Sequence, residues 1–187
     1  TAYEISLGLV GSEMCIRDRS KYGNRNPHDL AGIWQAQLSA LDIPHTGMAV
    51  TTDIGNTRDI HPKNKQEVGR RLALWALAKN YGKKDIVYSG PLFKSFKKKE
   101  NRIIVRFDHG KGLKSNNDKP LTHFELQGSE GKWFPADASI DEAELIVTSK
   151  TVLEPKSVRF GWNQEAEPNL VNGAGLPASP FTTAVLE

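Results

Sequence analysis

The sequence predicts a partial α/β layer followed by an antiparallel β-sandwich region. Two segments in the first half show the helical spacing of apolar residues, with a short apolar run between them. Four segments in the second half alternate or run apolar over strand lengths and are separated by turn-rich stretches. The composition agrees with a folded chain, because 38% of the 187 residues are hydrophobic and 25% are charged.

Residues 1–19, TAYEISLGLVGSEMCIRDR, are left out of the fold prediction. The segment is too weakly apolar for a secretory signal and has no basic leader. Read as codons it resembles translated sequencing-adapter DNA, so we interpret it as an artefact; an ordinary N-terminal segment is the alternative. The single cysteine, Cys15, lies in it, so the sequence predicts neither an internal disulfide nor a multi-cysteine metal site.

The first predicted helix covers about residues 29–42, with Asp29 as a possible cap. Its apolar residues recur at helical spacing. They are Leu30, Ile33, Trp34, Leu38 and Leu41. The next apolar run, MAVTTDIG at residues 48–55, turns polar toward its end. It predicts a buried strand that emerges into a loop, with Asp53 near the exit.

A second helix is predicted from about Pro62, where PKNKQEVGRRLALWALAKNYG begins. Val68, Leu72, Trp75 and Tyr81 follow one stripe of this helix. Proline suits a first helical turn, and a lysine and a glycine suit the end of the helix. The order helix, strand, loop, helix is typical of one edge of a layered α/β sheet, which we place at residues 20–84.

Residues 85–187 are predicted to form the β-rich region. Four strands are expected at residues 102–107, 123–128, 143–149 and 157–162. The lysine-rich stretch FKSFKKKENR before them predicts a solvated linker or the face of a hairpin. Residues 169–187 contain prolines, glycines and small residues, so irregular chain laid over the sandwich is expected there.

The candidate catalytic residue is His61, in the sequence TRDIHPKNK. A histidine acts as a general base when a carboxylate orients its ring and stabilises the imidazolium, and Asp59 and Asp53 are nearby in sequence. Pro62 and the predicted helix would anchor the loop at the carboxyl end of a strand, where open α/β sheets place their sites. A loop-packing or helix-capping histidine is the structural alternative.

The pattern TGMAVTTDIG…DIHPKNKQEVGRRLALWAL…YSGPL, with GLPASPF later, resembles the C-terminal part of the sialate O-acetylesterases, a branch of the SGNH or GDSL-like hydrolases. The resemblance covers residues 29–183. It implies the C-terminal part of a three-layer α/β SGNH-hydrolase domain, followed by a β-sandwich. It also implies acyl transfer by a serine nucleophile, with His61 matching the family's catalytic histidine.

The resemblance leaves the acid of the Ser-His-Asp mechanism open between two residues. The SGNH pattern has an aspartate three residues before the histidine, but Arg58 stands there in this sequence. Asp59, two residues before His61, is the first choice, and Asp53 is the alternative. The family's serine lies in a Gly-Glu-Ser type block that has no counterpart in this chain, so the chain by itself is expected to be inactive.

The expected substrate is an O-acetylated sialic acid or a related acetylated sugar, and family habit implies a periplasmic or secreted protein. No cofactor and no metal are expected, because none of the histidine pairs has a metal-ligand spacing. A net charge of +3 does not favour nucleic acid, and no apolar run is long enough to span a membrane. The alternative function is a non-catalytic carbohydrate-binding or domain-packing β-protein, in which Trp133 is the tryptophan that could stack on a sugar.

Overall fold

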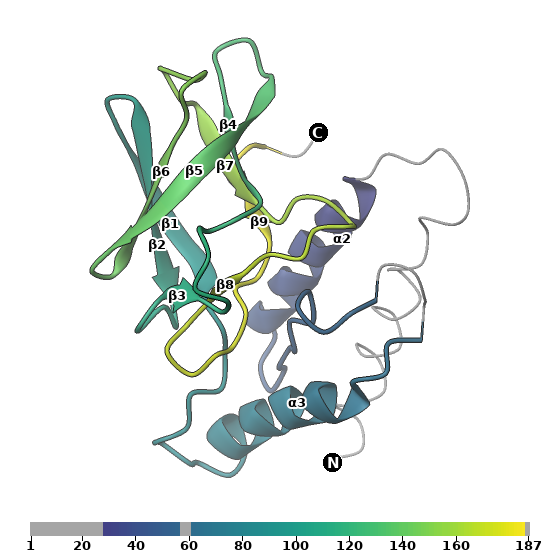
Figure 1. The fold of residues 1–187 in the computed structure, drawn as a ribbon. Coiled ribbons are helices and arrows are strands. Elements are labelled where there is room, and N and C mark those ends of the chain that lie inside the picture. The colour runs from purple at the N-terminus through teal and green to yellow at the C-terminus, as the bar shows by residue number, and fades with distance from the viewer. Residues whose placement is uncertain (1–27, 57–60, 186–187) are drawn as a thin grey trace. The chain divides into compact units, whose positions relative to one another are not determined.

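The computed structural model describes residues 28–56 and 61–185 (Figure 1). Residues 1–19, interpreted above as an artefact, lie outside this range. The chain divides into two compact units. The helical unit comprises the described residues up to Ser89 together with Asn163–Glu165, and the β unit comprises Gly90–Trp162 and Ala166–Glu187.

The helical unit holds α2 (Asp29–Leu38), a short 3-10 helix η2 (Ser39–Asp42) and α3 (Lys65–Lys79). The predicted first helix is therefore α-helical only to Leu38. Asn64 caps α3, because its side chain accepts a hydrogen bond from the amide of Glu67 at 3.2 Å. No helix in the described part of the chain is long and apolar enough to cross a membrane.

The strand predicted at residues 48–55 is absent, and this part forms a turn. The amides of Ile54 and Gly55 both donate to the carbonyl of Thr51, at 3.2 and 3.1 Å. In the described residues no other strand pairs with this segment. Buried backbone N–H and C=O groups need hydrogen-bond partners. A turn supplies such partners within the segment, whereas a single extended strand with no neighbouring strand does not.

The β unit is one seven-stranded antiparallel sheet with the strand order β1-β2-β6-β5-β4-β7-β9 (Figure 1). Its strands are β1 (Leu92–Lys99), β2 (Arg102–Asp108), β4 (Phe124–Gln127), β5 (Trp133–Asp141), β6 (Glu144–Thr148), β7 (Ser157–Phe160) and β9 (Phe181–Thr182). A separate two-stranded sheet pairs β3 (Lys114–Ser115) with β8 (Leu170–Val171).

The sheet curls until its two edge strands meet. Phe93 on β1 stacks on Phe181 on β9, with ring centroids 4.8 Å apart and planes 22° apart. Phe107 on β2 meets the same ring edge-on at 5.8 Å. Because β1 and β9 are the first and last strands of the sheet, these ring contacts make it a nearly closed barrel.

The predicted fold class is therefore wrong. The described chain is mostly β, with two α-helices, and it contains neither a three-layer α/β domain nor two facing sheets. Alternating side chains point to one interior along the curled sheet. Those with no measurable exposure are Ile103, Val105, Leu126, Leu145, Val147, Val158 and Phe160. A single curled sheet buries this face around one core, so no second sheet is needed to cover it.

Two buried asparagines organise the irregular chain of the β unit. The Asn169 amide nitrogen donates to Ser115 Oγ, Asn117 Oδ1 and the carbonyl of Pro120, at 3.1, 3.1 and 2.9 Å. Asn172 Oδ1 accepts from the amide of Leu176 at 3.1 Å. The C-terminal stretch is largely irregular, but it contributes β8 and β9. Side-chain amides here replace the partners that a regular strand would supply.

Gly90 is expected to tolerate no side chain. A Cβ at this position would lie 2.0 Å from the carbonyl oxygen of Pro177, so the backbone would have to move. We expect Gly90→Ala to lower the free energy of unfolding by about 1–3 kcal/mol, the usual cost of overpacking. The measurement is the midpoint of denaturant unfolding. In the control, Gly128→Ala, the nearest atom would be at 3.8 Å; an equal loss there would contradict the steric explanation.

Candidate functional site

His61 lies in the short segment that leads into α3. It is exposed and is followed by Pro62, and three residues later Asn64 caps the helix. The capped N-terminus of α3 gives the histidine segment a fixed attachment on its C-terminal side. Asp59, the first choice for the acid, lies outside the described residues, so its pairing with His61 stays a prediction.

Asp53, the alternative acid, is bound to Arg71 of α3. Its two carboxylate oxygens each accept a hydrogen bond from the guanidinium at 2.7 Å. Arg71 also donates to the carbonyl of Val50 and to Glu67, the latter at 2.8 Å. This arrangement ties the turn at residues 51–54 to the helix. Binding of this kind is a structural role for a loop carboxylate, and the part of Asp53 as the catalytic acid stays a prediction.

Arg71 was not singled out in the sequence analysis, although it is the most buried residue of α3, with 5% of its surface exposed. The available signal was its spacing of four residues from Glu67, which favours an ion pair on one helix face. Burial by itself would lower the pKa of the Arg71 guanidinium, but hydrogen bonds and charges from Asp53 and Glu67 raise it overall. The side chain therefore stays a buried cation.

Glu67 completes this network and titrates at unusually low pH. The pKa of the Glu67 carboxyl is lowered from 4.5 to about 2. The hydrogen bond from Arg70 is the largest cause of the lowering, burial acts in the opposite direction, and the hydrogen bond and charge of Arg71 lower the pKa further. Arg70 donates two hydrogen bonds to Glu67, each at 2.7 Å. The ionised carboxylate is thus a stabilising element of the first turn of α3.

The low pKa of Glu67 predicts a pH dependence of stability. Because the pKa is lower in the folded state, the group stabilises the fold fully above about pH 4.5, and this contribution is lost as the pH falls toward 2. Glu67→Gln should therefore be less stable than wild type at pH 7, and the difference should vanish near pH 2. Thermal melts of the chain across this pH range measure the difference.

Glu130→Gln is the matched control for this pH series. Glu130 pairs with Lys132, but both side chains are more than 70% exposed, so little effect on stability is expected at any pH. A Glu67→Gln difference from wild type that stays constant from pH 7 to pH 2 would contradict the assignment, because it would then not depend on ionisation.

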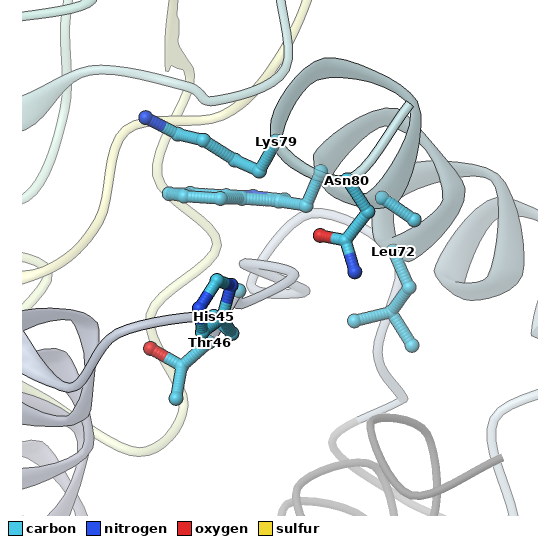
Figure 2. Close-up of a pocket in the computed structure, with 8 residues that line it drawn as sticks. His45, Thr46, Leu72, Lys79 and Asn80 are labelled. Atoms are coloured by element: carbon cyan, nitrogen blue, oxygen red, sulfur yellow. The ribbon is translucent and has the colours of Figure 1, made fainter. Parts of the chain in front are cut away.

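A small hollow lies along the last two turns of α3 (Figure 2). It is lined by His45, Thr46, Gly47, Leu72, Trp75, Ala76, Lys79 and Asn80. Its volume is about 10 Å³, enough for roughly one water and too small for a sugar ring. Gly47 lies against Trp75 so closely that an added Cβ would stand 2.8 Å from the Trp75 Cβ. The hollow is therefore a packing feature, at the opposite end of α3 from His61.

The lysine-rich segment forms β1, which pairs with β2 as a hairpin. Lys94, Lys97, Lys98 and Lys99 are all exposed on this edge strand. Lysines on an edge strand disfavour pairing with other chains, which accounts for the cluster without a ligand. Among the described residues no group of three or more histidine, cysteine or acidic side chains could hold a metal ion.

Trp133 on β5 lies over an ion pair in the β unit. The guanidinium carbon of Arg159 is 4.4 Å from the centroid of the indole ring. Arg159 in turn donates two hydrogen bonds to Glu125, at 2.7 and 2.9 Å. Trp34 and Trp162 are buried, with 8% and 6% exposed, whereas Trp133 is only partly buried.

Comparisons with known proteins connect the chain to sugar esterases. It is 28% identical over 157 residues to a sialate O-acetylesterase of Rattus norvegicus and 28% identical over 160 residues to that of Homo sapiens, covering 76% and 78% of this chain. A crystal structure of a carbohydrate acetylesterase from Xanthomonas citri matches 88% of the chain with 38% identity and a TM-score of 0.82. No family model matches.

These similarities show distant homology to sialate O-acetylesterases and a shared fold with a carbohydrate acetylesterase. The resemblance to the sialate O-acetylesterases that the sequence indicated is therefore confirmed as a distant homology. The chain spans only 29–30% of the length of the curated relatives and 39% of the solved chain.

Proposed function

We propose that this chain is part of a carbohydrate O-acetylesterase and that its β unit is a non-catalytic module of that enzyme. The observation that carries the proposal is the match to the carbohydrate acetylesterase of Xanthomonas citri, at 38% identity over 88% of this chain. The match covers 39% of that enzyme, so most of the enzyme lies outside the similarity. The substrate we propose is an O-acetylated sialic acid or a related acetylated sugar.

The hydrogen bonds of polar side chains in the β unit support the proposal that this unit is non-catalytic. Serine-type hydrolysis needs a nucleophile, a base and a group that orients the base, all within hydrogen-bond reach. In the described β unit Arg159 is held by Glu125, and Asn169 is held by the chain at residues 115–122. These hydrogen bonds connect strands and loops, which is a structural use of the groups.

His61 is proposed as the residue through which this chain takes part in the chemistry of the whole enzyme. A serine from outside this chain would attack the acetyl carbonyl while His61 accepts its proton, and the sugar oxygen would leave with that proton. Water would then release acetate from the acyl-enzyme. The bidentate pairing of Asp53 with Arg71 favours Asp59 as the acid that orients His61.

A chimeric enzyme tests the proposal. The matched segment of the Xanthomonas citri enzyme is replaced with residues 20–187 of this chain, and acetate release from acetylated sugars is measured. We expect the chimera to deacetylate them. A chimera that folds, as judged by a cooperative melt, but releases no acetate from any acetylated sugar would contradict the proposal.

The chain alone gives a second readout. We expect the purified 187-residue chain to hydrolyse an aryl acetate no faster than its own His61→Ala variant does. Hydrolysis above that control would show that the chain contains a nucleophile of its own, and would contradict the assignment of the serine to another part of the enzyme.

A further inference from the structure

The outer face of the β unit carries an ordered row of side chains across three strands. Gln127 on β4 is opposite Trp133 on β5 and Ser157 on β7. These residues alternate with core residues such as Leu126 and Val158, so they lie on the face away from the core. The row spans two strand spacings, about 10 Å.

The ring of Trp133 reaches diagonally from this row into the next one. Arg159 lies one row away, opposite Glu125, and two strands from Trp133. The guanidinium is bound to Glu125 on β4, and the 4.4 Å between its carbon and the ring centroid brings the indole toward β4 with one face on the guanidinium. Arg159 is only 7% exposed although it belongs to the outer face, which agrees with a ring lying over it.

The contacts of Arg159 hold the ring in place. Two hydrogen bonds to Glu125 fix the guanidinium plane, and the cation attracts the ring face that lies on it. The guanidinium takes up one face of the indole, so the opposite face is the one that a ligand could reach. Trp133 keeps part of its surface exposed, unlike Trp34 and Trp162. An aromatic ring fixed in this way binds a ligand at low entropic cost.

Polar groups stand beside the ring. The Gln127 amide is held by a hydrogen bond to the carbonyl of Gly131 at 2.9 Å, and Ser157 ends the row with a hydroxyl. The turn next to Trp133 carries the exposed pair Glu130 and Lys132. A pyranose ring has an apolar C–H face and a rim of hydroxyls, so it needs a flat apolar surface with hydrogen-bonding groups at its edge.

We propose that Trp133, Gln127 and Ser157 form a non-catalytic contact surface for the sugar chain of an acetylated oligosaccharide. The inference rests on the proposed function for its class of ligand and goes beyond it by giving the β unit a direct contact with carbohydrate. One pyranose ring stacks on the outward face of Trp133, and its hydroxyls, or those of the next ring, meet the amide and the hydroxyl of the row.

The test is a titration of the whole chain with two probes, an acetylated xylo-oligosaccharide and an O-acetylated sialic acid. Binding is followed by the ¹H–¹⁵N signals of the four tryptophan indoles. We expect saturable shifts of the Trp133 signal with at least one probe. We also expect Trp133→Ala to weaken binding at least about tenfold, as truncation of an aromatic anchor does. Trp133→Phe, which keeps a smaller ring, should fall between.

Leu153→Ala is the matched control, because Leu153 is an apolar residue of the β unit that is 68% exposed and outside the row. It should leave binding unchanged. If Trp133 only shields the Arg159–Glu125 pair, Trp133→Ala will lower the melting temperature and leave affinity unchanged, and the proposal is overturned. Absence of saturable shifts with both probes also overturns it, and needs no variant.

The sugar titration and the chimera experiment can fail independently of each other. The chimera's hydrolysis of an aryl acetate, which has no sugar ring, does not require the contact surface. An active chimera whose chain shows no sugar binding would overturn this inference alone. Sugar binding that depends on Trp133, together with a folded but inactive chimera, would contradict the esterase assignment and leave the contact surface standing.

Discussion

Replacing His61 with alanine in the chimeric esterase is expected to lower kcat by on the order of 10⁴-fold or more, as loss of a catalytic base does in serine hydrolases. Without His61 no group would accept the serine proton in the transition state. KM should change little, because a general base acts in the transition state and adds little to ground-state binding. Steady-state kinetics on an acetylated sugar measure both constants.

His45→Asn is the control for this experiment. His45 is also an exposed histidine, but its backbone φ of 65° lies in the left-handed region, which asparagine accepts. It lines the hollow at the far end of α3 and should leave kcat unchanged. A His61→Ala chimera that retains more than about a tenth of kcat would rule out His61 as the base.

The same chimera distinguishes the two candidate acids. Asp59→Asn is expected to lower kcat strongly with little loss of stability, because it would remove the group that orients the His61 ring. Asp53→Asn is expected to act mainly on stability, since Arg71 holds that carboxylate. Normal kcat in the Asp59 variant, with a large kcat loss and an unchanged melt in the Asp53 variant, would reverse the assignment.

Removing Asp53 is expected to cost about 3 kcal/mol of the free energy of unfolding, because Arg71 keeps Glu67 and the carbonyl of Val50 as partners but loses the two hydrogen bonds to Asp53, and donors of a buried charged group are then left unsatisfied. The side chains of Arg71 and Asp53 are 6% and 16% exposed, so water would solvate the remaining guanidinium poorly. Asp53→Ala shows the effect, measured by denaturant unfolding.

Two comparisons give this experiment its controls. Arg70→Met removes a guanidinium from the same helix, but the Arg70 side chain is 52% exposed, so the loss should be at most about 1 kcal/mol. The double variant Asp53→Ala with Arg71→Met should regain part of the stability lost in Asp53→Ala, because the buried guanidinium with unsatisfied donors is then gone. If Asp53→Ala, Arg70→Met and the double variant are equally stable, the ion pair between Asp53 and Arg71 does not stabilise the fold.

The elements that could be predicted from the sequence are those in which apolar residues recur at helical or strand spacing without interruption. α2, α3 and strands β2, β4, β6 and β7 lie where apolar residues recur at helical or strand spacing. β1 was predicted only as a linker or the face of a hairpin, because its inward phenylalanines, Phe93 and Phe96, are three residues apart across a register shift. That bulge breaks the two-residue alternation from which a strand is predicted.

β5 was missed for a different reason. Its inward side chains include Ala136 and Ala138, so the apolar alternation is weak, and it contains Pro135, which usually argues against a strand. The sheet accommodates it because Phe134, Ala136, Ala138 and Ile140 still face the core cluster. The small alanine side chains fit the crowded interior of a curled sheet. In the sequence, however, a stretch of small residues looks like a loop and not like a strand.

The sequence by itself determined the segments with a regular apolar period, the resemblance to sugar esterases and the place of His61 shortly before a helix. Each of these depends on residues close together in the chain. Only the tertiary structure decided that one sheet curls on itself, that Arg71 takes up Asp53, and that Trp133 lies over Arg159. These contacts join residues 18 to 88 positions apart, and local periodicity carries no information about which distant side chains meet once the strands pair.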